Sequence, residues 1–363
     1  MSARRPGSPG PVAVLYQALP PPVIGGVRKP AKPGGYADSG ADIAYVLRRA
    51  GEAVVTPVAT PQPDRHLDWV FPDTAEGIAA AQQSGARILW ANTILFRGHP
   101  LEQVAPPTAI VGQPPALVDR FDDKWAANAL LRQKGCAVAR GVLVGSAAAG
   151  AELPWKRLTA AELAARGLEF PLVIKPVRGR GSEGVRRIAD FAEFRREGGQ
   201  LLERHGETFI AEEFLAGEEI TLTVMPPGPY PFGPEAQRRT SYWALPTVRR
   251  FNHQEGIAPY SGVVSVVENS AVIPAAEADA PALTAIARES VRAAEIIGGQ
   301  APLRIDCRAT AGEYRLFDVN LKPNMTGPGR PGRDRQDSLT ALAARALGWE
   351  YADLIRNLLG LAW

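Results

Sequence analysis

Short apolar segments that alternate with helical patterns fill the first third of the chain, and they constrain its fold more than any other feature. Buried strands are predicted over residues 12–16, 54–58, 69–71 and 87–91. Helices are predicted over residues 39–51 and 74–84. This alternation implies a parallel sheet with right-handed crossovers. Ligands bind beyond the carboxyl ends of such strands, so the loops that follow Tyr16 and Ala91 are candidate substrate loops.

The rest of the chain mixes strands and helices without an internal repeat. Its 363 residues predict two or three domains. Residues 1–11 are rich in Pro, Gly and Ser and are expected to form a disordered tail. Further strands are predicted over 172–175, 185–188, 208–214, 220–225, 303–308 and 314–319. Further helices are predicted over 123–134, 190–205 and 276–297, and a surface loop over 226–234.

Charge and composition exclude several classes of protein. The net charge of +3, from 41 Lys+Arg and 38 Asp+Glu, is too balanced to indicate nucleic acid or an acidic membrane as the main partner. Two cysteines exclude a disulfide framework, and the four histidines lack the i, i+4 spacing of a zinc helix. The chain has no run of about 18 apolar residues that could span a bilayer. We therefore expect a cytoplasmic protein.

A glycine-rich segment in mid-chain carries the strongest chemical signal. Gly179, Gly181 and Gly184 spell G-x-G-x-x-G, but a dinucleotide fold needs that string between its first strand and a helix. A Walker loop needs Lys-Ser/Thr after the last glycine, where this chain has Val-Arg. A protein-kinase loop has its lysine on a later strand, whereas Lys175 precedes the glycines. The dinucleotide interpretation is disfavoured, and the other two fail.

What remains is a strand–loop–strand flap with Lys175 on its incoming strand. Glycines let backbone N–H groups approach phosphate oxygens closely, and Lys175 supplies a positive charge. Arg178, Arg180 and Ser182 add polar groups to the same loop. The alternative is a glycine hairpin with a solvated basic rim.

Three motifs together resemble the ATP-grasp superfamily. Residues 171–176 (P-L-V-I-K-P) and the following glycine loop resemble its phosphate-binding flap. Residues 212–220 (E-E-F-L-A-G-E-E-I) resemble the stretch that borders adenine and ribose. Residues 304–306 (R-I-D) and 318–320 (D-V-N) resemble its metal-binding strands. Over residues 119–325, the order and spacing are most similar to those of D-alanine–D-alanine ligases and related carboxylate–amine ligases.

The resemblance implies an α/β (α+β) ATP-grasp fold. A Rossmann-like domain with a parallel sheet, over residues 12–118, would hold the substrate. Residues 119–216 would form a central ATP-grasp subdomain with the flap, and residues 217–363 a C-terminal subdomain with the metal site. The two subdomains would sandwich ATP between them.

The resemblance also assigns residues to the nucleotide. Lys124 and Lys175 would contact the ATP phosphates, with Gly181 and Ser182 in the flap. For Lys124 the alternative is an exposed helix lysine. The adenine amino group would lie near Glu212, and the hinge beside the base would be the backbone of Glu213, Phe214 and Leu215.

The ribose contact is assigned to the second acidic pair of the same motif. Glu219 would accept hydrogen bonds from the ribose hydroxyls, because one carboxylate reaching two hydroxyls makes strong charge-assisted bonds. Glu218 is interpreted as a solvated charge instead.

Asp306, Asp318 and Asn320 form the sharpest constellation. Asp318 and Asn320 are two residues apart, so on a strand they point to one face, and Asp306 on the preceding strand can face them. Such hard oxygen ligands suit Mg²⁺ bridging ATP phosphates, with two ions expected and Mn²⁺ as an alternative. Arg304 faces the same side and could stabilise an acyl phosphate. The alternative is a hydrogen-bonded polar cluster, and Cys307 is expected in the core.

The chain departs from the ligase pattern at several positions. Asp318 stands where close relatives have Glu, and Asn324 where they have a glycine that helps hold the substrate carboxylate. The loop over residues 23–38 lacks the G-G-x-S-x-E string that holds the first D-alanine, which argues against D-alanine as the first substrate.

Other charged residues are candidates on position alone. The cations Arg249, Arg250 and His253 could cover the phosphates. Three further arginines could bind an acidic substrate, namely Arg330, Arg333 and Arg335. Solvated surface is the alternative for both groups, and an amino group could be held by Asp38 or Glu76.

The function implied is an ADP-forming ligase that joins a small-molecule carboxylate to an amine through an acyl phosphate. Electrostatic stabilisation and exclusion of water by the flap would be the protein's contribution. One alternative in the same fold is a carboxylase that activates bicarbonate. Another is a regulatory protein that binds ATP without turnover. A homodimer is an open possibility for its assembly.

Overall fold

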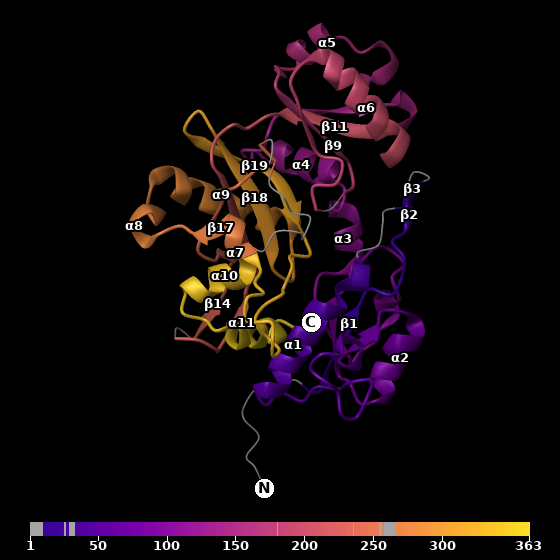
Figure 1. Cartoon of the computed structure of the whole chain (residues 1–363), viewed down its shortest axis with the longest axis vertical. Helices are drawn as coiled ribbons and strands as arrows, with labels where there is room; N and C mark the ends of the chain where they lie inside the picture. The colour runs from indigo at the N-terminus through magenta and orange to yellow at the C-terminus, as the bar shows by residue number, and fades with distance from the viewer. Residues whose placement is uncertain are drawn as a thin grey trace.

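Figure 1 presents the computed structural model of the chain. The structure describes residues 10–24, 27–28, 33–179, 181–234, 236–253, 256–257 and 266–363. Most of the predicted N-terminal tail, part of the loop over 23–38, and Arg180 lie outside these ranges. The described helices include none with the length and apolar character needed to cross a membrane.

The first sheet is parallel, as its alternating pattern predicts. Its strand order is β4-β1-β5-β6, and the strands are β1 (Val12–Tyr16), β4 (Val70–Pro72), β5 (Ile88–Asn92) and β6 (Ala109–Val111). The helices beside it are α1 (Ala37–Arg49) and α2 (Ala75–Gln83). The predicted strand over 54–58 is wrong. Only Val54 makes a bridge, to Val12, and Val58 is exposed beyond Pro57, which has no N–H to donate to a sheet.

The second sheet carries the glycine-rich flap. Its order is β10-β9-β11-β7-β8, with β7 (Gly141–Gly145), β8 (Leu153–Pro154), β9 (Leu172–Pro176), β10 (Arg186–Ile188) and β11 (Thr208–Glu213). Its helices are α5 (Ala160–Ala165) and α6 (Phe191–His205). Asp190 caps α6 by accepting a hydrogen bond from the Glu193 N–H at 2.8 Å. Phe194 on α6 and Phe209 on β11 are fully buried in one shared core.

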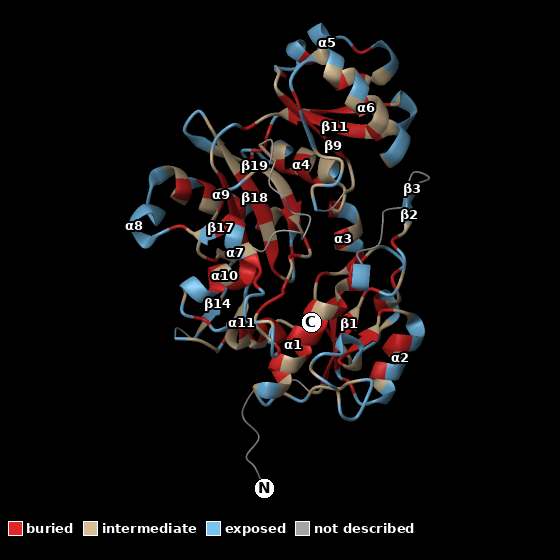
Figure 2. Cartoon of the chain, in the orientation of Figure 1, coloured by how far each residue is buried: buried red, intermediate tan, exposed pale blue. Residues whose placement is uncertain are grey.

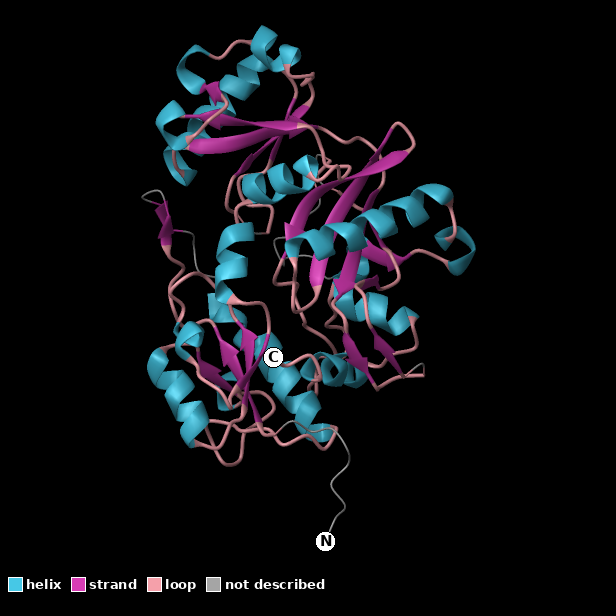
Figure 3. Cartoon of the chain, turned by 180° about the vertical axis from the view of Figure 1, so that it is seen from behind, coloured by secondary structure: helices cyan, strands magenta, loops and turns pink. Residues whose placement is uncertain are grey.

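The third sheet has the order β17-β16-β12-β18-β19, with β15 also paired to β12. Its strands are β12 (Glu219–Met225), β15 (Trp243–Ala244), β16 (Val248–Arg250), β17 (Ser270–Val272), β18 (Leu303–Thr310) and β19 (Glu313–Asn320). Figure 3, which views the molecule from behind, shows a long helix across this sheet, α9 (Pro281–Ile297).

Two predictions fail around this sheet. The helix expected over 276–297 is divided into α8 (Ala275–Ala278) and α9, because Pro281 lacks an N–H and opens a new helix at its first turn. The surface loop expected over 226–234 contains β13 (Gly228–Tyr230), which pairs with β14 (Gln237–Arg239). Tyr230 is fully buried there against Trp243 and Trp349, so an aromatic core residue overrides the proline-rich composition.

The remaining elements connect and cover the three sheets. The helices are α3 (Pro115–Phe121), α4 (Lys124–Gln133), α7 (Val266–Asn269), α10 (Leu339–Ala346) and α11 (Tyr351–Leu359). A short hairpin consists of β2 (Val23–Ile24) and β3 (Val27–Arg28). Short 3₁₀ helices lie at Pro33–Tyr36, His66–Asp68, Pro100–Gln103, Ala147–Ala149 and Trp155–Arg157.

The first and third sheets share their hydrophobic cores. One core contains Leu15 and Leu89 of the first sheet together with Ile305 of the third. The chain end also returns to the first sheet, where the Ile110 N–H donates to the Trp363 carbonyl at 2.8 Å. The core of the second sheet is confined to residues 142–211 among the described residues, and Figure 2 shows its buried strands beside the largely exposed α5 and the half-buried α6. The second sheet is therefore the part of the fold with the fewest core residues tying it to the other two.

Candidate active site

The predicted site residues gather around one cavity of about 820 Å³ between the second and third sheets. All thirteen line it, and they are Lys124, Lys175, Gly181, Ser182, Glu212, Glu213, Phe214, Leu215, Glu219, Arg304, Asp306, Asp318 and Asn320. This size is within the range of small-molecule sites in proteins. The structure thus brings together residues that are up to 196 positions apart in the sequence, from Lys124 to Asn320. Their individual roles stay predictions.

Lys175 and Glu212 form a buried ion pair on the wall made by the second sheet. They lie on the neighbouring antiparallel strands β9 and β11, and Lys175 Nζ is 2.6 Å from Glu212 Oε1. Lys175 Nζ also donates to the Phe317 carbonyl on β19 at 2.9 Å, which links the second sheet to the third. Burial raises the pKa of the Glu212 carboxyl, and Lys175 opposes that rise. These contacts with both sheets fix the Lys175 side chain beside the flap.

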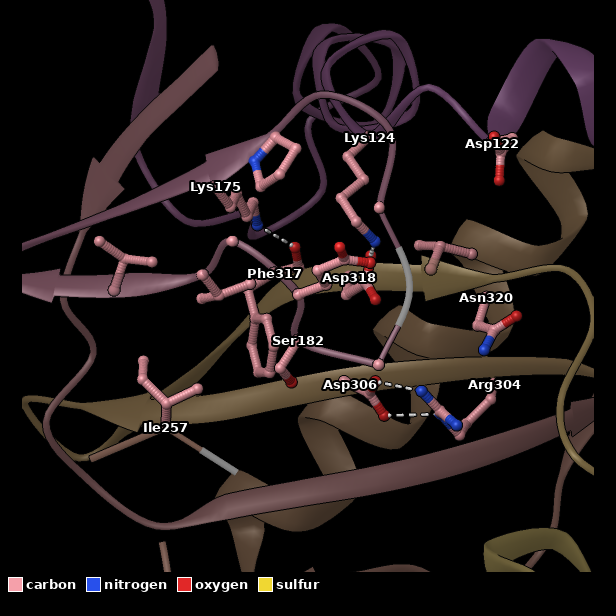
Figure 4. Close-up of a pocket in the computed structure, with 18 of the residues that line it drawn as sticks. Asp122, Lys124, Lys175, Ser182, Ile257, Arg304, Asp306, Phe317, Asp318 and Asn320 are labelled. Atoms are coloured by element: carbon pink, nitrogen blue, oxygen red, sulfur yellow. Dashed lines mark hydrogen bonds and ion pairs between the residues drawn. The ribbon is translucent and has the colours of Figure 1, made fainter. Parts of the chain in front are cut away.

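The acidic residues of the third sheet lie as the two-residue spacing predicts. Asp306 on β18 is the cross-strand partner of Asp318 on β19, and Arg304 is the partner of Asn320. Arg304 contacts both oxygens of Asp306, at 3.0 and 2.9 Å, and Figure 4 shows this pair below Asp318. Burial raises the pKa of the Asp306 carboxyl, while Arg304 opposes the rise. Two carboxylates and an amide therefore face one region of the cavity.

Lys124 reaches this acidic group from the first turn of α4. Its ammonium forms an ion pair with Asp318, which joins α4 to the third sheet. Burial acts to raise the pKa of the Asp318 carboxyl, but the charges of Lys124 and Lys175 outweigh it and hold that pKa below its usual value. The alternative of an exposed helix lysine is wrong, since Lys124 lies on the cavity wall.

The donor set fits a magnesium ion that also binds nucleotide phosphates. The described residues contain no group of three His, Cys, Asp or Glu side chains placed to hold a metal by themselves. Mg²⁺ is usually held by one or two carboxylates together with substrate phosphates and waters. Asp306 and Asp318, with the Asn320 amide, supply such a partial set.

The flap takes backbone conformations that suit a phosphate cradle. Gly181, Ser182 and Gly184 have φ of 61°, 61° and 72°. At Gly184 a Cβ atom would lie 2.8 Å from the Pro176 side chain, so glycine is required by space as well as by φ. Successive N–H groups in left-handed and turn conformations form concave anion sites. The part of the flap that the structure describes therefore has the backbone shape that its sequence predicts.

At the other end of the cavity, aromatic and acidic groups follow β11. The centroid of the Phe214 ring lies 4.9 Å from the guanidinium group of Arg187 and 5.0 Å from that of Arg308. Glu219 Oε2 is 2.9 Å from His253 Nε2. His253, one of the three residues predicted to cover the phosphates, thus contacts a residue of the cavity wall.

Several charged residues are committed to other partners. The prediction that Glu218 is a solvated charge is wrong, because Glu218 pairs with Arg249 and accepts a hydrogen bond from Tyr314. Arg249 also pairs with Glu277, and Arg250 on the same strand β16 donates to Ser270 on the neighbouring β17. Neither arginine is among the described residues that line the cavity.

The second group of predicted substrate cations instead joins the first sheet to the C-terminal region. Arg330 and Arg333 both pair with the fully buried Asp42 of α1, each at 2.8 Å. Arg333 also lies 3.5 Å from Asp38. Arg335 is exposed, as is Glu76. The three arginines, Asp38 and Glu76 are not among the described residues that line the cavity. Binding of an acidic substrate by the arginines is therefore not supported, and neither is binding of an amino group by Asp38 or Glu76.

A buried carboxylate that the sequence analysis missed holds the loop after β1. Asp73 Oδ1 accepts hydrogen bonds from the Ala18 and Leu19 N–H groups, both at 2.8 Å. Its Oδ2 accepts from Thr93 at 2.5 Å and lies 3.2 Å from His99 Nε2. Asp73 therefore fixes a candidate substrate loop at the carboxyl ends of the parallel strands.

Replacement of Asp73 by Asn is expected to destabilise the fold in a pH-dependent way. Burial acts to raise the pKa of the Asp73 carboxyl, but the hydrogen bonds from His99, Thr93 and the backbone outweigh it and lower that pKa below 3.8. A lowered pKa contributes stability above pH 3.8 that is lost as the pH falls through the folded-state value. We expect Asp73→Asn to cost about 1–3 kcal/mol at pH 7, with a smaller difference in acid.

Urea denaturation of both proteins at pH 7 and at about pH 2.5, which is below the ordinary carboxyl pKa of 3.8, measures this difference. Asp64→Asn is the matched control, since this exposed carboxylate makes the same change of side chain and should give an unchanged midpoint at both pH values. An Asp73→Asn midpoint that stays equal to that of the wild type at pH 7 would show that the carboxylate does not hold the loop.

Comparisons with known proteins agree with this geometry. Residues 154–360 match the family model described as D-ala D-ala ligase C-terminus. A D-alanine–D-alanine ligase of Verminephrobacter eiseniae is 26% identical over 219 residues, which are 57% of this chain and 58% of that protein. One of Bordetella petrii is 28% identical over 193 residues, 52% and 51% of the two chains. The chain thus spans little more than half the length of the curated relatives it matches.

Solved structures extend the likeness to the whole fold. The D-alanine–D-alanine ligase of Bacillus anthracis, solved in complex with ATP, has a TM-score of 0.65 at 16% identity and covers 96% of both chains. The D-Ala:D-Ser ligase of Enterococcus faecalis has a TM-score of 0.61 at 15% identity, over 97% of this chain and 99% of that one. The predicted α/β ATP-grasp fold is confirmed. This includes the first sheet, where only the order of strands and helices in the sequence resembles the family.

Proposed function

We propose that this chain, which belongs to the family described as D-ala D-ala ligase C-terminus, is an ATP- and Mg²⁺-dependent ligase that joins a small carboxylic acid to an amine. The proposal rests on one observation above all. Two lysines, an arginine and two carboxylates from three separate parts of the chain face one cavity beneath a glycine flap, and they are Lys124, Lys175, Arg304, Asp306 and Asp318.

The proposed reaction has two steps. A carboxylate oxygen of the acid attacks the γ-phosphorus of ATP, the bond to the bridging oxygen breaks, and ADP leaves. The amine nitrogen then attacks the carbonyl carbon of the acyl phosphate, the C–O bond to phosphate breaks, and the nitrogen loses a proton. The products are an amide, ADP and phosphate.

The protein's part is to neutralise and position charge. Lys124 and Lys175 attract the phosphates, and Arg304 faces the charge that develops on the transferring group. Asp306, Asp318 and Asn320 would hold two Mg²⁺ ions, with Mn²⁺ as an alternative, and a bound ion would neutralise phosphate charge. The flap residues Gly181 and Ser182 would exclude water, which would otherwise hydrolyse the acyl phosphate.

The nucleotide would lie along the cavity from the flap to the end of β11. Glu212 would approach the adenine amino group, and Glu219 the ribose hydroxyls. The backbone of Glu213, Phe214 and Leu215 would form the hinge beside the base, where the Phe214 ring contacts two arginines. The division into units at 12–118, 119–216 and 217–363 and a homodimeric assembly are parts of the same proposal.

A screen of ATP turnover tests the proposed function. ADP and phosphate release with Mg²⁺ is measured against pools of amino acids and small carboxylic acids, with and without amines. We expect release that depends on an acid and rises with an amine. Stimulation by bicarbonate alone would favour a carboxylase, and tight ATP binding without stimulation by any pool would favour a regulatory protein. Either result would overturn the ligase.

A further inference from the structure

One lysine that the sequence analysis did not single out lies where the cavity meets the first sheet. Lys322 is in the loop that follows β19, and it lines the cavity together with Asn324. Pro33, Tyr36 and Ile94 line the same cavity, and they come from loops at the carboxyl ends of β1 and β5. This end of the cavity thus combines a cation with apolar walls, at the position where parallel sheets bind ligands.

The Lys322 side chain is held in a defined place. Its ammonium donates to Asn92 Oδ1 at 3.2 Å and lies 3.7 Å from the centroid of the Tyr36 ring. Asn92 in turn donates to the Tyr36 carbonyl at 3.0 Å and to Ser39 Oγ at 3.1 Å. The Asn92 amide and the Tyr36 ring are uncharged groups, and they direct the ammonium.

The loop that carries Lys322 is fixed at both ends. The Lys322 N–H donates to Asn320 Oδ1 at 2.9 Å, and the lysine is two residues after this proposed metal-binding group. Further along, the buried pair of Arg330 and Asp42 ties the loop to α1, and Tyr351 donates to the Met325 carbonyl at 2.6 Å. The ammonium is therefore a preorganised charge within a small molecule's length of the proposed site of phosphoryl transfer.

We infer that Lys322 determines substrate specificity by binding a substrate carboxylate. This carboxylate is not the one that receives the phosphoryl group. This inference rests on the proposed function and names a substrate class for it. The carboxylate belongs either to a dicarboxylic acid or to an amine substrate that is itself an amino acid. Lysine suits this task because an ammonium is a compact charge that accepts a carboxylate from several directions.

The first arm of the test uses pairs of acids that differ in one carboxylate: succinate with butyrate, aspartate with alanine, and glutamate with glutamine. The KM of each acid is measured by ADP release, and its binding by calorimetry, in the wild type, Lys322→Met and Lys322→Arg. For a dicarboxylic substrate, Lys322→Met should raise KM by roughly 10- to 100-fold, the loss expected for a charged hydrogen bond. The KM for ATP should stay unchanged, and Lys322→Arg should restore most of the affinity.

The second arm compares glycine with glycinamide, and alanine with alaninamide, as the amine. If the carboxylate belongs to the amine, Lys322→Met should raise KM for the free amino acids and leave the amides unchanged. Equal KM values and binding for both members of every pair in the wild type and in Lys322→Met would overturn the inference while leaving the ligase intact. Absence of ADP release with every acid, despite bound ATP, would instead overturn the proposed function. If calorimetry also detects no binding of any acid or amine, the inference is overturned as well.

Discussion

Lys175→Met should lower acid-dependent ADP release by roughly 100- to 1,000-fold, the loss typical of removing one preorganised group that stabilises charge in a transition state. The side chain of Lys175 is buried beneath the flap, where water cannot replace its charge. Initial rates of ADP release at saturating ATP measure the effect. ATP binding should weaken less than the rate falls, because the charge on the transferring group develops during the reaction.

The variant needs a control for folding, because Lys175 also neutralises Glu212. Removing one partner of a buried ion pair costs about 3–5 kcal/mol, since the other charge stays buried alone. The double variant Lys175→Met/Glu212→Gln removes both charges and should recover most of the lost stability in urea denaturation. It should remain inactive. A double variant that releases ADP at the wild-type rate would contradict the role of Lys175.

Asp318→Asn is expected to abolish most of the Mg²⁺ dependence of nucleotide binding. The substitution keeps the size of the side chain and removes the charge that a hard cation prefers. The Mg²⁺ concentration that half-saturates binding of a fluorescent ATP analogue should rise more than about 10-fold, because a charged ligand interaction is lost. The rate of ADP release should fall with it.

Lys124→Met is the matched control for this prediction. It breaks the same ion pair from the other side and leaves the Asp318 carboxylate on β19. We expect weaker nucleotide binding with its Mg²⁺ dependence preserved. An unaltered Mg²⁺ titration in Asp318→Asn, or equal loss of the dependence in both variants, would contradict the assignment of Asp318 as a metal ligand.

Much of the site follows from local spacing in the sequence. Residues two apart on a strand share a face, so the spacing alone places Arg304 with Asp306, and Asp318 with Asn320, on one side of a hairpin. The glycines of the flap and the N-cap at Asp190 are likewise encoded within a few residues. The parallel sheet of the first third follows from the alternation of strands and helices.

Long-range pairing explains what the sequence could not predict. Arg330 looks like a loop cation, but its partner Asp42 is 288 residues away, and no local pattern relates the two. Glu218 looks solvated for the same reason, since Arg249 reaches it from another strand. No periodic pattern singles out Lys322, because its contacts are with Asn92 on β5 and with Tyr36 in the 3₁₀ helix before α1.

The most direct test of the ligase mechanism follows oxygen from the acid to phosphate. An acid identified by the screen is labelled with ¹⁸O in its carboxylate, and the phosphate released with ADP is analysed by mass spectrometry. The mechanism predicts one ¹⁸O atom in each phosphate, because the acid oxygen that attacks the γ-phosphorus stays with phosphate when the amine displaces it. Unlabelled phosphate, or label in AMP, would contradict an acyl-phosphate ligase.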